Sequence, residues 1–204
     1  AIVIHAVWHL INYRKISQYR GITSLDFWTA VVAALGVLAI GILQGILLAV
    51  FLGLLGLLFG IKATTTAVLG TVPGEKTYRS LENDPDGETY PGLLIVRFDG
   101  SIFFANAPDF VDEIRAGVEA FGPSVILVDC ESITSIDATA IIAMSELNNE
   151  LDRAGITLRF ARVRQTVINV MKRSRDGQAL DPDRFYVSVQ AGVDAYLQET
   201  DEAQ

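Results

Sequence analysis

The feature that most constrains this chain is an apolar run, residues 27–61, in which 35 consecutive positions carry no charge. About 18 apolar residues already indicate a membrane span. One straight helix of this length would measure about 52 Å, whereas the hydrocarbon core of a bilayer is about 30 Å thick. The only amide of the run lies between Gly41 and Gly45. We therefore expect a hairpin of two helices, 27–40 and 46–61, each short for a complete crossing.

Charge divides the chain near residue 62. The net charge of the whole chain is −8, and residues 1–62 carry +3, which leaves −11 for residues 63–204. Basic residues precede the apolar run at 12–20, and Lys62 ends it. Because basic flanks favour the cytoplasmic side of a membrane, a hairpin would place both of its ends there. The sequence thus predicts terminal transmembrane segments in residues 1–62.

The polar half begins with a mixed segment, 63–92, in which we expect a linker and a first strand, AVLGTV. From residue 93 to 204, short apolar runs alternate with helical patterns. The run VILVDC is typical of a central strand that is buried on both faces. A helical face follows it, formed by Ala140, Met144, Leu147 and Leu151. Such alternation predicts an α/β domain with a mostly parallel sheet and flanking helices.

Other segments of this domain have their own predictions. LLIVRFDGSIFFANA predicts two short strands around Asp99-Gly100, a hairpin turn signal. A helix is expected next, because four apolar residues recur at helical spacing: Phe110, Ile114, Val118 and Phe121. ITLRFA and FYVSV are expected strands, and RQTVINVMKRS and AGVDAYLQE are expected helices.

Several function classes lack their motifs in this sequence. The domain at 93–204 has no glycine-rich phosphate loop, no GxSxG and no histidine. His5 and His9 are too few ligands for a metal site. The segment 162–175 is basic, but it lies in an acidic domain and predicts a solvated helix surface rather than a face for nucleic acid. The single cysteine, Cys130, is expected to be a small buried residue. We expect no enzyme, no cofactor, no metal and no nucleic-acid partner.

A carboxylate, Asp137, and a hydroxyl, Thr139, lie between the expected strand VILVDC and the start of the next helix. The segment is Asp137-Ala138-Thr139-Ala140. Asp is a preferred N-cap residue, because its side chain accepts hydrogen bonds from the free N–H groups two and three positions on. Capping alone therefore explains Asp137.

The second half of the chain resembles a STAS domain, the fold shared by anti-sigma factor antagonists and the tails of sulfate-permease (SulP) anion transporters. The resemblance rests on VLGTVPG, PGLLIVRFDGSIFFANA, VILVDC and SITSIDATA. With the apolar hairpin before it, the match covers nearly the whole chain. The fold class it implies is membrane α-helical segments, 1–62, followed by an α/β STAS-like domain, 93–204.

This resemblance implies a role and a location. The chain would be the C-terminal part of a secondary active transporter of an inorganic anion such as sulfate, and its anion site would lie upstream of residue 1. It would be an integral protein of the inner or plasma membrane, in contact with the lipid bilayer, with a cytoplasmic STAS domain that serves regulation and assembly. A homodimer and a regulatory protein partner are also implied. The alternative is a membrane-tethered STAS module that binds a kinase-like or anti-sigma-type partner without transport.

The resemblance also implies a possible regulatory role for Thr139. Antagonists carry Asp-Ser-Ser-Gly at this turn, and the second serine is phosphorylated. Thr139 matches that phosphoacceptor, next to Asp137, whereas Ala138 and Ala140 depart from the pattern. A phosphate here would meet the positive end of a helix dipole, while Asp137 would repel it. A structural cap and a regulatory phosphosite both stay open.

Overall fold

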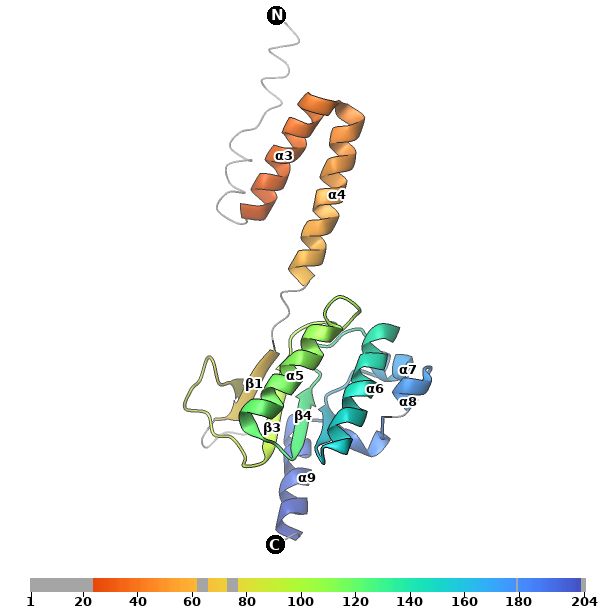
Figure 1. Cartoon of the computed structure of the whole chain (residues 1–204). Coiled ribbons are helices and arrows are strands. Elements are labelled where there is room, and N and C mark those ends of the chain that lie inside the picture. Colours follow the sequence, from red (N-terminus) through yellow and green to blue (C-terminus); the bar gives the residue numbers. More distant parts are fainter. Residues whose placement is uncertain (1–23, 62–65, 73–76, 179, 203–204) are drawn as a thin grey trace, which may run out of the picture. The chain divides into compact units, whose positions relative to one another are not determined.

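The computed structural model describes residues 24–61, 66–72, 77–178 and 180–202. The chain divides into two compact units, Ala1–Ile61 and Lys62–Gln204. Figure 1 shows the helices and strands of each unit. Three features named in the sequence lie outside the described residues: the basic segment at 12–20, the histidine pair and Lys62.

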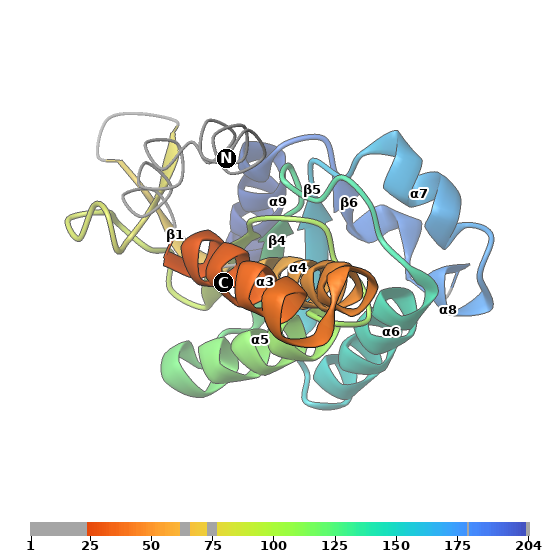
Figure 2. The same ribbon diagram turned by 90° about the horizontal axis from the view of Figure 1, so that it is seen from above.

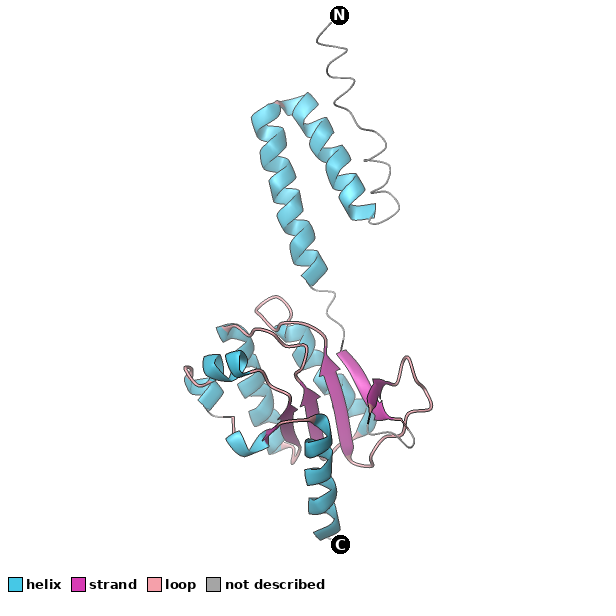
Figure 3. Cartoon of the chain, turned by 180° about the vertical axis from the view of Figure 1, so that it is seen from behind, coloured by secondary structure: helices cyan, strands magenta, loops and turns pink. Residues whose placement is uncertain are grey.

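The apolar run of unit 1 folds into two helices, α3 (Ser24–Ile40) and α4 (Ile42–Ile61), which lie side by side (Figures 1 and 3). The chain reverses at a single residue, Gly41, whose φ of 108° is in the region that favours glycine. The break is therefore narrower than the expected Gly41–Gly45 segment. Gly45 instead lies inside α4, where a Cβ atom would overlap Val37 of the facing helix.

Membrane spans were expected in residues 1–62. Within the described part of the chain, no helix combines the length and the apolarity that crossing a membrane requires. Gly41 divides the apolar run into α3 and α4, and neither helix supports the expectation of transmembrane segments.

Unit 2 is built on a six-stranded sheet in the order β2-β1-β3-β4-β5-β6. The strands are β1 (Thr66–Thr71), β2 (Tyr78–Ser80), β3 (Leu93–Phe98), β4 (Val125–Asp129), β5 (Thr157–Ala161) and β6 (Phe185–Tyr186). The pairings from β3 to β6 are parallel, as predicted, but β1 runs antiparallel to both β2 and β3. The sheet is therefore mixed. In its register, Leu93 pairs with Val125, and Val125 pairs with Thr157.

Helices cover both faces of this sheet. They are α5 (Ala107–Phe121), α6 (Ala138–Arg153), α7 (Gln165–Met171), α8 (Arg175–Gln178) and α9 (Val189–Glu202), with a 3-10 turn at Pro182–Arg184. Figure 2 shows α5 and α6 on one side of the strands and α9 on the other, and Figure 3 shows α9 from its own side. The faces have separate cores because side chains alternate along a strand: Leu94 and Val96 pack with α5 and α6, while Leu93 and Ile95 pack with α9.

The central strand and the helix after it confirm their predictions. All five residues of β4 are buried, as expected of a strand covered on both faces. The predicted face of α6 is also buried, from Ala140 through Met144 and Leu147 to Leu151. These two elements bracket the segment that contains Asp137 and Thr139.

The predicted hairpin around Asp99-Gly100 is wrong. After β3 the chain makes a single parallel bridge, between Ile102 and Ile136, and then turns into α5. Asn106 closes that turn, because its Oδ1 accepts the N–H of Phe103 at 2.8 Å. The turn signal is real, with Gly100 at a φ of 137°, but the strand after it pairs with a segment more than thirty residues away.

Smaller differences concern the ends of elements. Phe121 closes the predicted helical face of α5 but is 54% exposed. The helix expected in RQTVINVMKRS ends at Met171, and the last expected strand is only two residues long. The strand β2 lies in the segment 63–92, for which only a linker and the first strand were expected.

Candidate functional site

The loops after three parallel strands meet at the carboxyl edge of the sheet. They are residues 99–106 after β3, 130–137 after β4 and 162–164 after β5. The first two are joined by the bridge between Ile102 and Ile136 and by a hydrogen bond of 2.7 Å between the Ser101 and Thr134 hydroxyls. In α/β folds this edge is where ligands and partners usually bind.

Asp137 holds this edge together through both oxygens of its carboxylate. It is the N-cap of α6, and its Oδ1 accepts the N–H of Ala140 at 2.8 Å. Its Oδ2 accepts the N–H of Phe104 at 2.8 Å. The cap predicted from the sequence is therefore present, and the same side chain also fixes the loop that carries Phe104.

Thr139 lies in the first turn of α6, and its side chain is exposed. Three exposed residues are linked to it through the helix or through its cap. Ala138 precedes it, Ile142 lies one turn along the same helix face, and Phe104 is held beside the cap by Asp137. Phe104 is 62% exposed and Ile142 is 45% exposed. We call these four residues, Phe104, Ala138, Thr139 and Ile142, the Thr139 patch.

Sequence reasoning found Thr139 and Asp137 but missed the apolar part of the patch. Phe104 was assigned to a strand, where alternate side chains are buried, and Ile142 stands between buried positions of α6. The signal was available in the helical spacing, because Ile142 falls three residues after Thr139 and off the predicted core face.

An ion pair joins the last residue of β4, Asp129, to Arg162 in the loop after β5. Asp129 is fully buried, and its carboxylate accepts both Nε (2.8 Å) and Nη2 of Arg162. Arg162 reaches it from a backbone with a φ of 58°, unusual for a residue other than glycine. Its Nη1 lies 2.5 Å from the Glu131 carboxylate. The hydrogen bonds to Asp129, and then the charges of both acids, raise the pKa of Arg162 above its ordinary value.

The remaining polar residues of this edge have structural partners. Asp99 pairs with Arg97 (2.9 Å) and accepts the Ser132 hydroxyl (3.0 Å). Cys130 is buried, as predicted, and burial, followed by the nearby Asp129 charge, raises the pKa of its thiol far above the usual value. A neutral buried thiol is a poor nucleophile.

Within the described residues, no group of three or more His, Cys, Asp or Glu side chains could hold a metal ion. The edge offers hydroxyls, exposed apolar side chains and a neutralised arginine.

Comparison with known proteins identifies the family of the domain that contains this edge. The family model described as STAS domain matches residues 84–189, more than half of the chain. This chain belongs to the STAS-domain family. The match contains the carboxyl-edge loops and the whole of α6, so the Thr139 patch is part of the STAS domain itself.

Relatives of this STAS chain are named as transporters. It is 30% identical over 206 aligned positions to a probable sulfate transporter of Mycobacterium tuberculosis, an alignment that covers 96% of this chain and 35% of that protein. The chain thus spans about a third of the length of the curated relatives it matches. The resemblance seen in the sequence, to a STAS domain of sulfate-transporter type, is confirmed.

Solved structures share the fold. The murine Slc26a9 anion transporter in its inward-facing state matches with a TM-score of 0.79 and 18% identity, over 93% of this chain and 31% of that one. A sulfate transporter family protein from Wolinella succinogenes matches with a TM-score of 0.50 and 21% identity, over 61% of this chain and 99% of that one. The first likeness exceeds unit 2, residues 62–204, and therefore also takes in part of unit 1.

Proposed function

We propose that this STAS chain is the C-terminal portion of a secondary active transporter of inorganic anions of the sulfate class. One observation carries the proposal: the sequence similarity to a probable sulfate transporter extends over 96% of the chain, the apolar unit included. The anion site would lie in the part of the transporter outside residues 1–204. The protein would reside in the inner or plasma membrane, with unit 2 in the cytoplasm.

The apolar hairpin would be the last element of the transporter's membrane domain. Support comes from its uncharged sequence and from the close approach at Gly45, since small residues let helices pack tightly in lipid. Paired short helices persist at membrane depth where neighbouring protein shields their turn. The homodimer implied by the resemblance belongs to the same proposal.

Regulation would act through the Thr139 patch. Its exposed Phe104 and Ile142 provide apolar area for a partner protein, and Asp137 fixes the loop that carries Phe104 to the start of α6. A phosphate on Thr139 would add about −1.5 to −2 charges in the middle of that area. Because a buried charge without a partner is costly, phosphorylation would release a partner docked there. The positive end of the α6 dipole would partly stabilise the phosphate, and would therefore reduce this loss of binding without abolishing it.

The test of transport uses the complete gene product in cells that lack their own sulfate uptake. Radiolabelled sulfate should accumulate, and Thr139→Glu should change the rate while Thr139→Ala does not. Thr166→Glu is the matched control, because Thr166 is an exposed threonine on α7, outside the patch. A well-expressed protein that takes up no anion would contradict the transporter proposal.

The second candidate function, a membrane-tethered signalling module, is favoured by one observation, the exposure of Thr139 at the phosphoacceptor position. It would give no uptake but a Thr139-dependent complex with a kinase-like or anti-sigma-type partner. Uptake that Thr139→Glu and Thr166→Glu change equally would leave transport standing and remove the regulatory role of the patch.

A further inference from the structure

A cavity of about 320 Å³ lies beneath α7 and α8, away from the Thr139 patch. Its walls are mainly apolar, from Ile168 and Met171 of α7 to Leu180, Pro182 and Phe185 after α8. Nothing in the anion-transport proposal uses it. Its volume falls at the lower end of the range for small-molecule sites, which are typically apolar clefts with a few polar groups.

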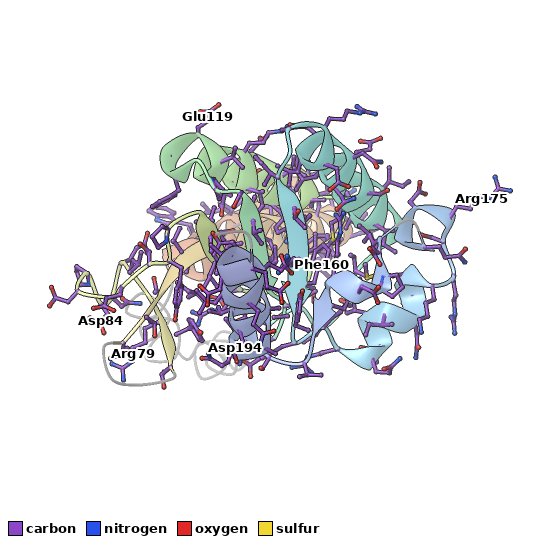
Figure 4. All side chains as sticks on the ribbon, turned by 90° about the horizontal axis from the view of Figure 1, so that it is seen from below. Arg79, Asp84, Glu119, Phe160, Arg175 and Asp194 are labelled. Carbon is purple, nitrogen blue, oxygen red and sulfur yellow. The ribbon has the colours of Figure 1, made fainter. Side chains whose placement is uncertain are left out.

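The cavity is held open by contacts of its own walls. Its floor residue Phe185 stacks on Phe160 of the core, with ring centroids 5.2 Å apart; Figure 4 shows Phe160 in the interior of unit 2. The lining residue Gln178 is tied to α7, because its side-chain amide donates to the Lys172 carbonyl at 2.7 Å. At Gly177 a Cβ atom would overlap the Met171 backbone, so glycine allows α8 to approach α7 closely.

One charged side chain lines this cavity, Lys172. It is exposed, and it belongs to the segment 162–175, which has five basic residues and no acidic one. Arg173 and Arg175 are also exposed, and Figure 4 shows Arg175 pointing away from the body of unit 2. Two acidic residues adjoin the lining in sequence, Asp176 and Asp181, and both are exposed. The Asp181 carboxylate accepts the N–H of Asp183 at 3.0 Å.

We propose that this cavity binds a free medium-chain fatty carboxylate. The hydrocarbon chain would fill the space between Ile168, Met171 and Phe185, and the carboxylate would pair with the Lys172 ammonium at the rim. Charge complementarity decides the head group, because the sole charge of the lining is positive. Size selects the occupant, because a space of about 320 Å³ suits one short hydrocarbon chain better than a peptide.

The chain offers a site-specific reporter for this ligand. It contains two methionines, both 3% exposed and part of the same core; Met171 lines the cavity and Met144 does not. The 204-residue chain, labelled with ¹³C-methyl methionine and reconstituted in lipid nanodiscs, would be titrated with decanoate. We expect the Met171 methyl signal to move saturably and the Met144 signal to stay. From hexanoate to decanoate, affinity should rise about fourfold per methylene.

Two matched variants test the head group. Lys172→Gln should weaken decanoate binding about tenfold, since a hydrogen bond between charged groups is lost. Arg173→Gln removes a neighbouring exposed charge that does not line the cavity, and it should change affinity less than twofold. Decanol, which has no charge, should bind equally to both variants. Ile168→Phe should block the site by filling it.

Three outcomes of these titrations would contradict binding of a fatty carboxylate in the cavity. Absence of a saturable Met171 shift at millimolar decanoate would overturn the proposal. Equal losses in Lys172→Gln and Arg173→Gln would also overturn it, because the carboxylate would then sense only the general basic surface. A Met144 shift as large as that of Met171 would overturn the proposal, because it would indicate partition into the core or the lipid rather than binding in the cavity. The first two variants change exposed residues, so the comparison stands even if Ile168→Phe does not fold.

Discussion

Removing the Asp137 carboxylate should cost unit 2 more stability than a simple helix cap would. The side chain makes two hydrogen bonds of 2.8 Å, to the N–H groups of Ala140 and Phe104. Loss of an N-cap costs about 0.5–2 kcal/mol, and loss of the second bond adds about 0.5–1.5 kcal/mol. Asp137→Ala should therefore lower the free energy of unfolding by about 1–3.5 kcal/mol. Asp137→Asn, an equally good cap, should lose only about the second part.

The assay is urea unfolding of residues 62–204, followed by circular dichroism, with amide hydrogen exchange at the two donors. Asp137→Ala should speed exchange at both Ala140 and Phe104, whereas Asp137→Asn should speed it at Phe104 only. Thr139→Ala should stay within about 0.5 kcal/mol of the wild type, as expected for an exposed side chain. If Thr139→Ala costs more than Asp137→Ala, the hydroxyl is a structural group and the reasoning fails.

Three further outcomes are expected in the same unit, which should itself unfold in one cooperative step. Leu127→Ala, at a fully buried position of β4, should cost about 2–5 kcal/mol; a smaller loss would mean that the core on the α9 side collapses onto the gap. Arg162→Gln should cost about 3–5 kcal/mol in urea unfolding, because it strands the buried Asp129 carboxylate. Arg162→Gly should cost about 1 kcal/mol less, since it relieves the left-handed backbone; the reverse order would exclude backbone strain. The pKa of the Cys130 thiol is raised by burial in the folded state, so the unfolded thiol ionises first, above about pH 8.5. Its contribution to stability is constant below that pH and falls by about 1.4 kcal/mol by pH 9.5; Cys130→Ala should flatten the decline, and identical pH profiles would refute the assignment.

Local signals in the sequence were enough for the elements that bracket the site. The continuous apolar run of β4 predicts burial on both faces, and helical spacing predicts the buried face of α6. Asp137 is recognisable as a cap because its bond to the N–H of Ala140 spans only three residues. These features depend on neighbours in the chain, so periodicity and residue type suffice to find them.

The features that were missed depend on distant residues. The strand expected after Gly100 does not fold back on β3, because Ile102 finds Ile136 instead. The pairing of Asp129 with Arg162 joins residues 33 apart and needs a positive φ that nothing in the sequence announces. An acidic residue at the end of a fully apolar strand was the one available hint that a buried cation would be required.

The three central strands start 32 residues apart, since Leu93 pairs with Val125 and Val125 with Thr157. The entropy of closing a loop depends on its length, so the β3–β4 and β4–β5 pairings are equally costly for the unfolded chain. Connection length therefore does not determine which pairing forms first. Both pairings need β4, so the side chains of β4 contribute to either step. Changes in β4 should slow folding itself, whereas changes in the two-residue strand β6 should mainly speed unfolding.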